Sequence, residues 1–242
     1  MIVAKFIAHR GFAKEKKQNT ISAFQRASES GAYGVETDVR ITKDGVFVAF
    51  HDKSAARLCG KHKKIENTDF VMLQKLKVFD RQRRHRIPTF LEYLQNCKAS
   101  GKVAVVEIKS SLTEEQTEKL IEIINTEDYL SKSIFLSFNK QVLSYIRLNL
   151  PDQPIQLLAY KYKHEDLEFC QGNKIDIDIY HRRLTKERIN EYHNHGIKVN
   201  CWTVNGGKRS KLLQEWGVDY ITTDKLSFSE KCLPYLSTTY VE

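Results

Sequence analysis

Short apolar runs alternate with amphipathic segments along almost the whole chain. The apolar runs are rich in β-branched residues, which favour strands. They predict strands at residues 4–8, 34–40, 103–108, 134–137, 155–159, 175–179, 197–202 and 219–222. Between these runs apolar residues recur at helical spacing, which predicts helices beginning at Thr20, Thr113, Asn139 and Thr185 and a last one around Leu212. Strands that alternate with helices are typical of parallel β/α units.

Eight such units in 242 residues predict an α/β fold, a single (β/α)₈ TIM barrel, since such barrels typically need about 250 residues. We expect one domain over residues 1–242, because the chain contains no linker and no internal repeat. An open, doubly wound sheet is not favoured, because no glycine-rich phosphate loop follows the first strand.

One stretch departs from the alternation. After a turn at Asp44-Gly45 and a second strand-like run at 46–50, residues 52–88 are polar, basic and poorly periodic. They predict a long basic loop region after His51, with a short helix near 68–76. Long loops at the carboxyl ends of barrel strands usually shape the substrate entrance.

The composition narrows the range of partners and compartments. A net charge of +9 favours acidic partners, but the basic residues are scattered in clusters typical of solvated loops, and no nucleic-acid-binding module is present. We therefore expect no nucleic acid, and binding of nucleic acid through the basic loops is only a weak alternative. The chain shows no signal peptide and no apolar run of transmembrane length, so no stable membrane anchor is expected. The odd number of scattered cysteines indicates reduced thiols in a cytoplasmic protein: Cys59, Cys97, Cys170, Cys201 and Cys232. The oligomeric state is not predicted.

Three carboxylates are candidates for a metal site. Glu36 and Asp38 lie two residues apart in a predicted strand and so point to the same side of it, while Glu107 lies in the next barrel strand. Three hard oxygen ligands suit a divalent cation, Mg²⁺ or Ca²⁺. The alternative is that Glu36 and Asp38 are ordinary surface carboxylates on an edge strand.

Two histidines and two cations follow or end predicted strands close to these carboxylates. His9 and His51 have side chains suited to proton transfer near neutral pH. Arg10 and Lys109 could stabilise the charge that a phosphoryl group gains in its transition state. Trp202 ends a later strand, where an indole would overhang the entrance and contact the apolar part of a ligand. Each residue alone also has a structural interpretation, as a buried hydrogen-bonding histidine, a salt-bridge partner or a core tryptophan.

Several short motifs, taken in order, resemble the glycerophosphodiester phosphodiesterase family. They are His9-Arg10-Gly11, Asn19-Thr20, Glu36-Thr37-Asp38, Thr42-Lys43-Asp44-Gly45, His51-Asp52, Ile87-Pro88-Thr89, Glu107-Ile108-Lys109 and Trp202-Thr203-Val204-Asn205. The resemblance implies a (β/α)₈ barrel with a divalent cation on Glu36, Asp38 and Glu107. It also implies that His9 and His51 form a general acid/base pair and that Arg10 and Lys109 lie near the phosphate.

The reaction implied by this resemblance is hydrolysis of a glycerophosphodiester to an alcohol and glycerol 3-phosphate, either by direct attack of water or through a cyclic phosphate. Two alternatives stay open: a lysophospholipase D-type enzyme that acts on longer lipid substrates, and a non-catalytic phosphate-binding barrel. One motif departs from the family, because Lys17-Gln18 stands where Pro-Glu is usual. The loss of that acidic residue is expected to change the support of the site from its second shell of contacts.

Overall fold

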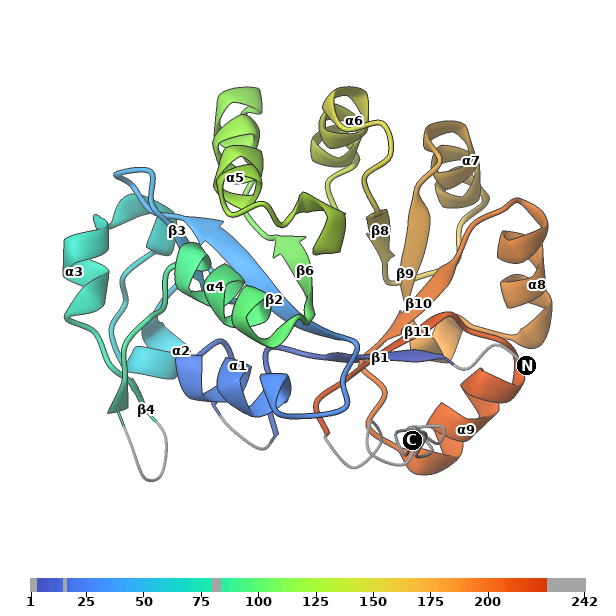
Figure 1. The fold of residues 1–242 in the computed structure, drawn as a ribbon, viewed down its shortest axis with the longest axis horizontal. Helices are drawn as coiled ribbons and strands as arrows, with labels where there is room; N and C mark the ends of the chain where they lie inside the picture. Colours follow the sequence, from blue (N-terminus) through green and yellow to red (C-terminus); the bar gives the residue numbers. More distant parts are fainter. Residues whose placement is uncertain (1–3, 15–16, 80–83, 226–242) are drawn as a thin grey trace, which may run out of the picture.

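The computed structural model describes residues 4–14, 17–79 and 84–225. The remaining residues of the predicted domain, Cys232 among them, lie outside this described part. Eight parallel strands follow one another around a ring, and β1 pairs with both β2 and β11, so the sheet closes into a barrel (Figure 1). The strands are β1 (Lys5–Ala8), β2 (Gly34–Ile41), β6 (Val103–Ile108), β7 (Ser133–Ser137), β8 (Ile155–Ala159), β9 (Asp176–Tyr180), β10 (Val199–Trp202) and β11 (Tyr220–Thr223). The predicted (β/α)₈ barrel is confirmed, and each predicted strand agrees within two residues.

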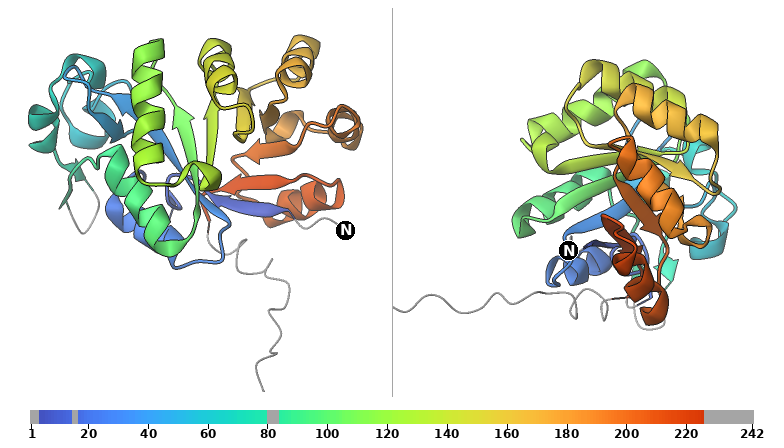
Figure 2. Two further views of the ribbon diagram at one scale, coloured as in Figure 1. Left: turned by 45° about the horizontal axis from the view of Figure 1, so that its top comes forward. Right: turned by 90° about the vertical axis from the view of Figure 1, so that its right-hand side faces the viewer.

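Helices surround the barrel on its outside (Figure 2). They are α1 (Ile21–Ser28), α4 (Phe90–Ser100), α5 (Glu114–Thr126), α6 (Lys140–Asn149), α7 (His164–Asn173), α8 (Lys186–Asn194) and α9 (Gly207–Glu215). The polar residues predicted to begin four of these helices, Thr20, Thr113, Asn139 and Thr185, each accept a backbone N–H of the first turn. Side-chain capping therefore fixes these four helix starts, as the sequence indicated.

Two helices were not predicted from the apolar pattern. Helix α4 begins with a reciprocal capping box between Thr89 and Glu92, a signal that the sequence does carry. Helix α7 has no side-chain cap, and only Leu167 and Cys170 are buried along its ten residues. Its helical conformation is therefore stabilised mainly by packing against the barrel rather than by a strong local signal.

The region between β2 and α4 forms a small unit of its own, rather than a loop with a single short helix. Strand β3 (Phe47–Ala49) pairs antiparallel with β2, and the chain then forms α2 (Ala56–Cys59), a 3₁₀ turn (Ile65–Asn67), α3 (Phe70–Gln74), β4 (Val78–Phe79) and β5 (Arg84–His85). Its buried side chains form a separate apolar cluster that includes Leu58, Ile65, Leu73, Val78 and Ile87. The elements are too short to produce a periodic pattern, so the sequence predicted a loop.

The carboxylate of Glu66 is one of the groups that join this rim insertion, residues 52–88, to the barrel. Glu66 Oε1 accepts hydrogen bonds from Arg40 Nη1 at 3.0 Å and from Ser110 Oγ at 2.7 Å. Arg40 lies near the end of β2, and Ser110 follows the end of β6. The insertion is therefore held at the end of the barrel where these parallel strands finish.

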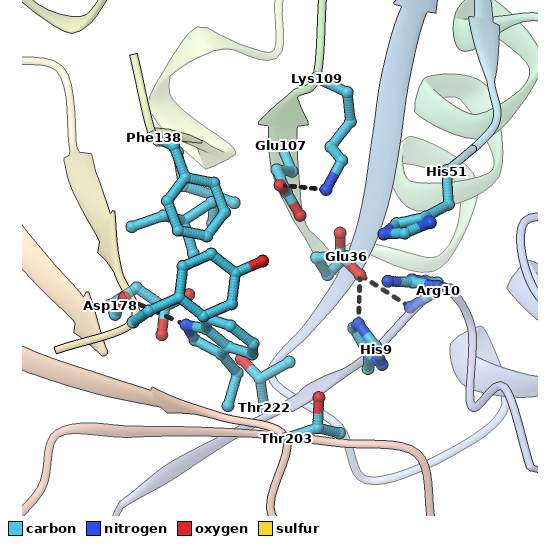
Figure 3. Close-up of a pocket in the computed structure, with 14 residues that line it drawn as sticks. His9, Arg10, Glu36, His51, Glu107, Lys109, Phe138, Asp178, Thr203 and Thr222 are labelled. Carbon is cyan, nitrogen blue, oxygen red and sulfur yellow. Dashed lines mark hydrogen bonds and ion pairs between the residues drawn. The ribbon is translucent and has the colours of Figure 1, made fainter. Parts of the chain in front are cut away.

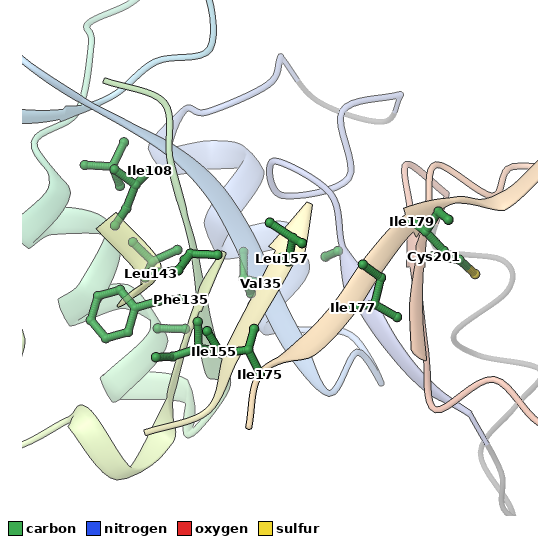
Figure 4. Close-up of a cluster of buried hydrophobic side chains, with 14 of the residues drawn as sticks. Val35, Ile108, Phe135, Leu143, Ile155, Leu157, Ile175, Ile177, Ile179 and Cys201 are labelled. Atoms are coloured by element: carbon green, nitrogen blue, oxygen red, sulfur yellow. The ribbon is translucent and has the colours of Figure 1, made fainter. Parts of the chain in front are cut away.

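The hydrophobic core has two layers. The outer layer, which includes Phe135, Leu143 and Ile177, fills the space between the strands and the helices (Figure 4). The inner layer fills the barrel itself and contains Ile7, Val105, Ile134, Leu136, Leu158 and Tyr220. Within residues 4–14, 17–79 and 84–225, no helix is both long and apolar enough to cross a membrane. The packed interior leaves room for polar chemistry at the carboxyl ends of the strands.

Candidate active site

A pocket opens at the carboxyl ends of the barrel strands. Seven of the eight residues singled out from the sequence line it: His9, Arg10, Glu36, His51, Glu107, Lys109 and Trp202. The eighth, Asp38, is completely buried and contacts Arg10 and Lys109. Figure 3 shows that these side chains come from several different strands and point toward one another. Barrel closure has thus gathered residues that are up to 193 positions apart in the chain.

The three acidic residues converge because of strand register. Strands β2 and β6 pair in parallel with Asp38 opposite Glu107, and Glu36 points to the same side as Asp38. One carboxylate oxygen from each residue lies within 4.8 Å of the others, and all three side chains are buried. Among the described residues, Glu36 Oε1 and Asp38 Oδ1 have no hydrogen-bond partner. The edge-strand alternative is wrong, because β2 lies between β1 and β6 inside the closed barrel.

The electrostatics of this acidic cluster favour a bound cation. Burial and then the charges of Asp38 and Glu107 raise the pKa of Glu36 well above its usual value. Burial and then the Asp38 charge raise the pKa of Glu107 to about 7. Asp38 differs: burial would raise its pKa, but the charges of Arg10, His51, Lys109 and His9 together outweigh burial and lower the pKa of Asp38 to about 2. The protein alone cannot keep all three groups ionised near neutral pH, whereas a divalent cation would favour that state.

Arg10 has an unusual backbone that places it against this cluster. Its φ of +51° lies in the left-handed region, and its N–H donates to Glu36 Oε2 at 2.8 Å. Its side-chain Nε lies 3.0 Å from Asp38 Oδ2, and its Nη1 donates to Gln18 Oε1 at 2.8 Å. The next residue, Gly11, also has a positive φ, and a Cβ atom there would lie 2.5 Å from the backbone of Ala23. Glycine is therefore required in this turn.

Lys109 lies on the other side of the acidic cluster. Its Nζ donates to Glu107 Oε1 at 2.8 Å and lies 3.7 Å from Asp38 Oδ1. Arg10 and Lys109 therefore form the ion pairs that one interpretation of the sequence suggested. Both also line the pocket.

The two histidines are oriented in the same way, each by a carboxylate. Nδ1 of His9 lies 2.6 Å from Asp224 Oδ1, and Nδ1 of His51 lies 2.7 Å from Asp52 Oδ1. Burial alone would raise both pKa values, but His9, Asn205 and Arg10 together lower the pKa of Asp224. Arg57 and His51 together lower the pKa of Asp52 in the same way. Both carboxylates are thus ionised near neutral pH, so each imidazole carries its proton on Nδ1. This leaves Nε2 for the pocket, and in His9 that atom lies 4.0 Å from Glu36 Oε2.

Sequence reasoning missed several residues that shape the site. Asn19 donates to Asp38 Oδ2 at 2.7 Å and accepts from Thr37 Oγ1 at 2.9 Å, so it fixes the Asp38 carboxylate. Asp224, Phe138 and Tyr160 each directly follow a barrel strand. This position could have identified them from the sequence, because His9 was identified by the same position directly after a strand.

The wall of the pocket across from His51 is aromatic. The rings of Phe138 and Tyr160 are stacked with their centroids 4.7 Å apart, and Trp202 meets Tyr160 edge-on at 5.2 Å. The indole N–H of Trp202 donates to the backbone oxygen of Asp178 at 3.1 Å. Trp202 therefore borders the pocket, as the sequence predicted, and its orientation is fixed by this hydrogen bond.

The arrangement can bind a divalent cation and a phosphate and move protons on either side of it. A model of the glycerophosphoryl diester phosphodiesterase family matches residues 9–227. A glycerophosphodiester phosphodiesterase from Caldanaerobacter subterraneus subsp. tengcongensis is 30% identical over 90% of this chain and 93% of its own. A similar enzyme from Bacillus altitudinis is 27% identical over 92% of this chain and 95% of its own.

Solved structures show the same fold. A glycerophosphodiester phosphodiesterase from Parabacteroides distasonis has a TM-score of 0.82 and 26% identity, covering 95% of this chain and 96% of its own. An Oleispira antarctica phosphodiesterase, solved with the product sn-glycerol-3-phosphate, has a TM-score of 0.87 and 22% identity, covering 96% of this chain and 97% of its own. The chain belongs to the glycerophosphoryl diester phosphodiesterase family, a family of phosphoric diester hydrolases.

Proposed function

We propose that this protein hydrolyses glycerophosphodiesters to an alcohol and glycerol 3-phosphate with the help of a divalent cation, Mg²⁺ or Ca²⁺. The observation that carries the proposal is the group of three buried carboxylates, within 4.8 Å of one another, beside two oriented imidazoles in a member of this family. The sn-glycerol-3-phosphate bound to the Oleispira relative supports a product of this class.

Glu36, Asp38 and Glu107 would hold the cation. Two observations fit this role: Glu36 and Asp38 each have an oxygen without a hydrogen bond among the described residues, and the pKa of Glu107 is raised. A bound divalent cation supplies positive charge that stabilises the non-bridging oxygens of the phosphate. Lys109 and Arg10 would add fixed positive charge at the same place and orient the phosphate.

The two histidines would divide the proton transfers. Burial lowers the pKa of His51, so its Nε2 is unprotonated near neutral pH and can accept a proton from the attacking group, either water or a hydroxyl of the substrate's glycerol. With both ring nitrogens protonated, a form that the Asp224 carboxylate stabilises, His9 would donate its Nε2 proton to the departing alkoxide. Asp52 and Asp224 would act as positioning residues that hold the two rings.

The proposal includes a single catalytic domain over residues 1–242 and a small-molecule substrate, without nucleic acid. The family match over residues 9–227 supports one domain. The pocket supports a small ligand, because its wall is built from barrel residues such as Glu36 and Trp202 rather than from the basic rim insertion.

The test is an assay of purified protein with Mg²⁺, with Ca²⁺ and with a chelator, in which release of glycerol 3-phosphate from glycerophosphocholine is followed. We expect release with a cation, none with the chelator, and recovery when cation is added back. Tight binding of the diester without turnover, under every cation, would instead identify a non-catalytic phosphate-binding barrel.

A further inference from the structure

The pocket has two halves of different chemistry. The charged half contains the catalytic candidates, among them Glu36, His51 and Lys109. The aromatic half consists of Phe138, Tyr160 and Trp202, with Leu136 and Leu158 behind them. Figure 3 shows the labelled Phe138 and Asp178 across the pocket from His51 and Arg10. A phosphate held in the charged half would direct one of its two organic groups into the aromatic half.

Asp178 is an exception within the aromatic half. It lies on β9 between Leu158 of β8 and Asn200 of β10, and its side chain lines the pocket. The residue is only 3% exposed, and its Oδ1 has no hydrogen-bond partner within the described part of the chain. The neighbouring amide does not contact it: Asn200 Nδ2 donates to Gln156 Oε1 at 2.9 Å instead.

A buried carboxyl without a partner destabilises the fold unless a ligand satisfies it. Burial and then the charge of Glu107 raise the pKa of Asp178 well above its usual value. In its neutral form the group can both donate and accept a hydrogen bond, and a hydroxyl group has the same two capacities. The carboxyl of Asp178 therefore matches an alcohol better than it matches the phosphate or an alkyl chain.

We propose that Asp178 binds the terminal hydroxyl of the substrate's glycerol group and thereby selects diesters in which that hydroxyl is free. This inference rests on the function proposed above. The aromatic rings would contact the glycerol carbons, and the terminal hydroxyl is the glycerol oxygen farthest from phosphorus. Glycerol has the same length in every glycerophosphodiester, which suits a group buried to this degree, whereas the alcohol on the other side varies in size.

The inference also separates the two candidate substrate classes. A lipid acylated on the terminal hydroxyl would present an ester, which has no hydrogen to donate, and would bury the Asp178 carboxyl against an alkyl chain. Such a diester should therefore be a poor substrate. The lysophospholipase D-type alternative is disfavoured to the same extent.

The test compares glycerophosphocholine with an analogue in which propane-1,2-diol replaces glycerol, so that only the terminal hydroxyl is lost. For Asp178→Leu we expect about a tenfold rise in KM for glycerophosphocholine with kcat nearly unchanged, and little change for the analogue. Asp178→Asn retains a donor and an acceptor and should restore most of the affinity. Asp176→Asn, on the same strand outside the pocket, serves as the matched control.

Several results would overturn the inference. If Asp178→Leu lost activity equally on both substrates, Asp178 would have a structural role. If it lost activity on neither, Asp178 would have no role in substrate binding. A loss that follows the choline group, rather than the glycerol group, would assign Asp178 to the leaving alcohol.

A binding experiment distinguishes failure of this inference from failure of the proposed function. Calorimetry with glycerol 3-phosphate and with the phosphate of propane-1,2-diol requires no turnover. If the wild-type protein hydrolyses no diester, the proposed function is wrong, but a tenfold preference for glycerol 3-phosphate that Asp178→Leu abolishes would still support this role of Asp178. Equal binding of the two phosphates by the wild-type protein would refute it.

Discussion

Acidic residues at the two ends of the barrel have opposite surroundings. At the amino ends of the strands, Asp219 Oδ2 accepts the backbone N–H of Val199 at 2.8 Å and lies 2.8 Å from His193 Nε2. At the carboxyl ends, Glu36 and Asp38 each keep one buried oxygen without a hydrogen bond in the part that the structure describes. The same chemical group thus completes hydrogen bonds of the fold at Asp219 and leaves one oxygen without a hydrogen bond at Glu36 and at Asp38.

This difference indicates separate roles for carboxylates at the two ends of one sheet, in stability at one end and in ligand binding at the other. A carboxylate whose bonds are satisfied contributes to stability, whereas a buried one that is unsatisfied lowers stability and is retained for a ligand. Substitutions at the two ends should therefore separate activity from stability.

The largest effect is expected at the acidic cluster. Glu36→Gln should reduce hydrolysis by about 10³-fold or more, because a cation ligand is lost. Its midpoint of thermal unfolding without cation should stay equal or rise. The folded-state pKa of Glu36 is raised, so this group's contribution to wild-type stability is present at low pH and lost as the pH rises, and the variant's advantage should grow with pH. A variant that lost its folded structure together with its activity would contradict the separation of activity from stability.

The histidine pair should give the next largest effect. His51→Gln is expected to lower kcat by about 10² to 10⁴-fold while cation binding persists, because proton transfer is lost and the carboxylates remain. His164, an exposed histidine on α7, provides the control, and His164→Gln should leave kcat unchanged. A drop in cation affinity that matched the drop in kcat would show that His51 acts on the metal site instead.

Cation binding should become tighter as the pH rises. Glu36 and Glu107 have raised pKa values, so both groups hold protons near neutral pH and a cation must displace them. The apparent affinity for Mg²⁺ or Ca²⁺ should therefore increase as the pH rises from about 6 to 8, with proton release on binding. Calorimetry in buffers of different ionisation enthalpy measures both quantities. An affinity that stays constant over this range would argue against these residues as the ligands.

The smallest effect on activity is expected at the amino ends of the strands. Asp219→Ala leaves the backbone N–H of Val199 without its acceptor, which should lower the free energy of unfolding by about 1 to 3 kcal/mol. The kcat of the folded variant should remain near that of the wild type. Asp219→Asn keeps an acceptor oxygen and should lose less stability in denaturant titrations. A large loss of kcat in either variant would show that Asp219 contributes to activity and would contradict the separation of activity from stability.

Much of the site could be predicted because it depends on local rules. Side chains two residues apart share a face of a strand, which grouped Glu36 with Asp38, and strand ends identified His9 and His51. The partners that orient these side chains were harder to find. Asp224 contacts His9 only because β11 pairs with β1 across the closure of the barrel. Residues 52–88 were predicted as a loop for a related reason, since their short elements are held together by a shared apolar cluster.

The sequence by itself determined the order of strands and helices, most helix starts and the residue types available for catalysis, because these follow from spacing and side-chain chemistry. Only the tertiary structure decided which carboxylates find partners and which stay open, since that depends on strand register and on closure of the sheet. The contrast between the satisfied Asp219 and the unsatisfied Asp178 arises in this way. Asp219 directly precedes β11 and Asp178 lies in the middle of β9, and burial beside different neighbours gives them different roles.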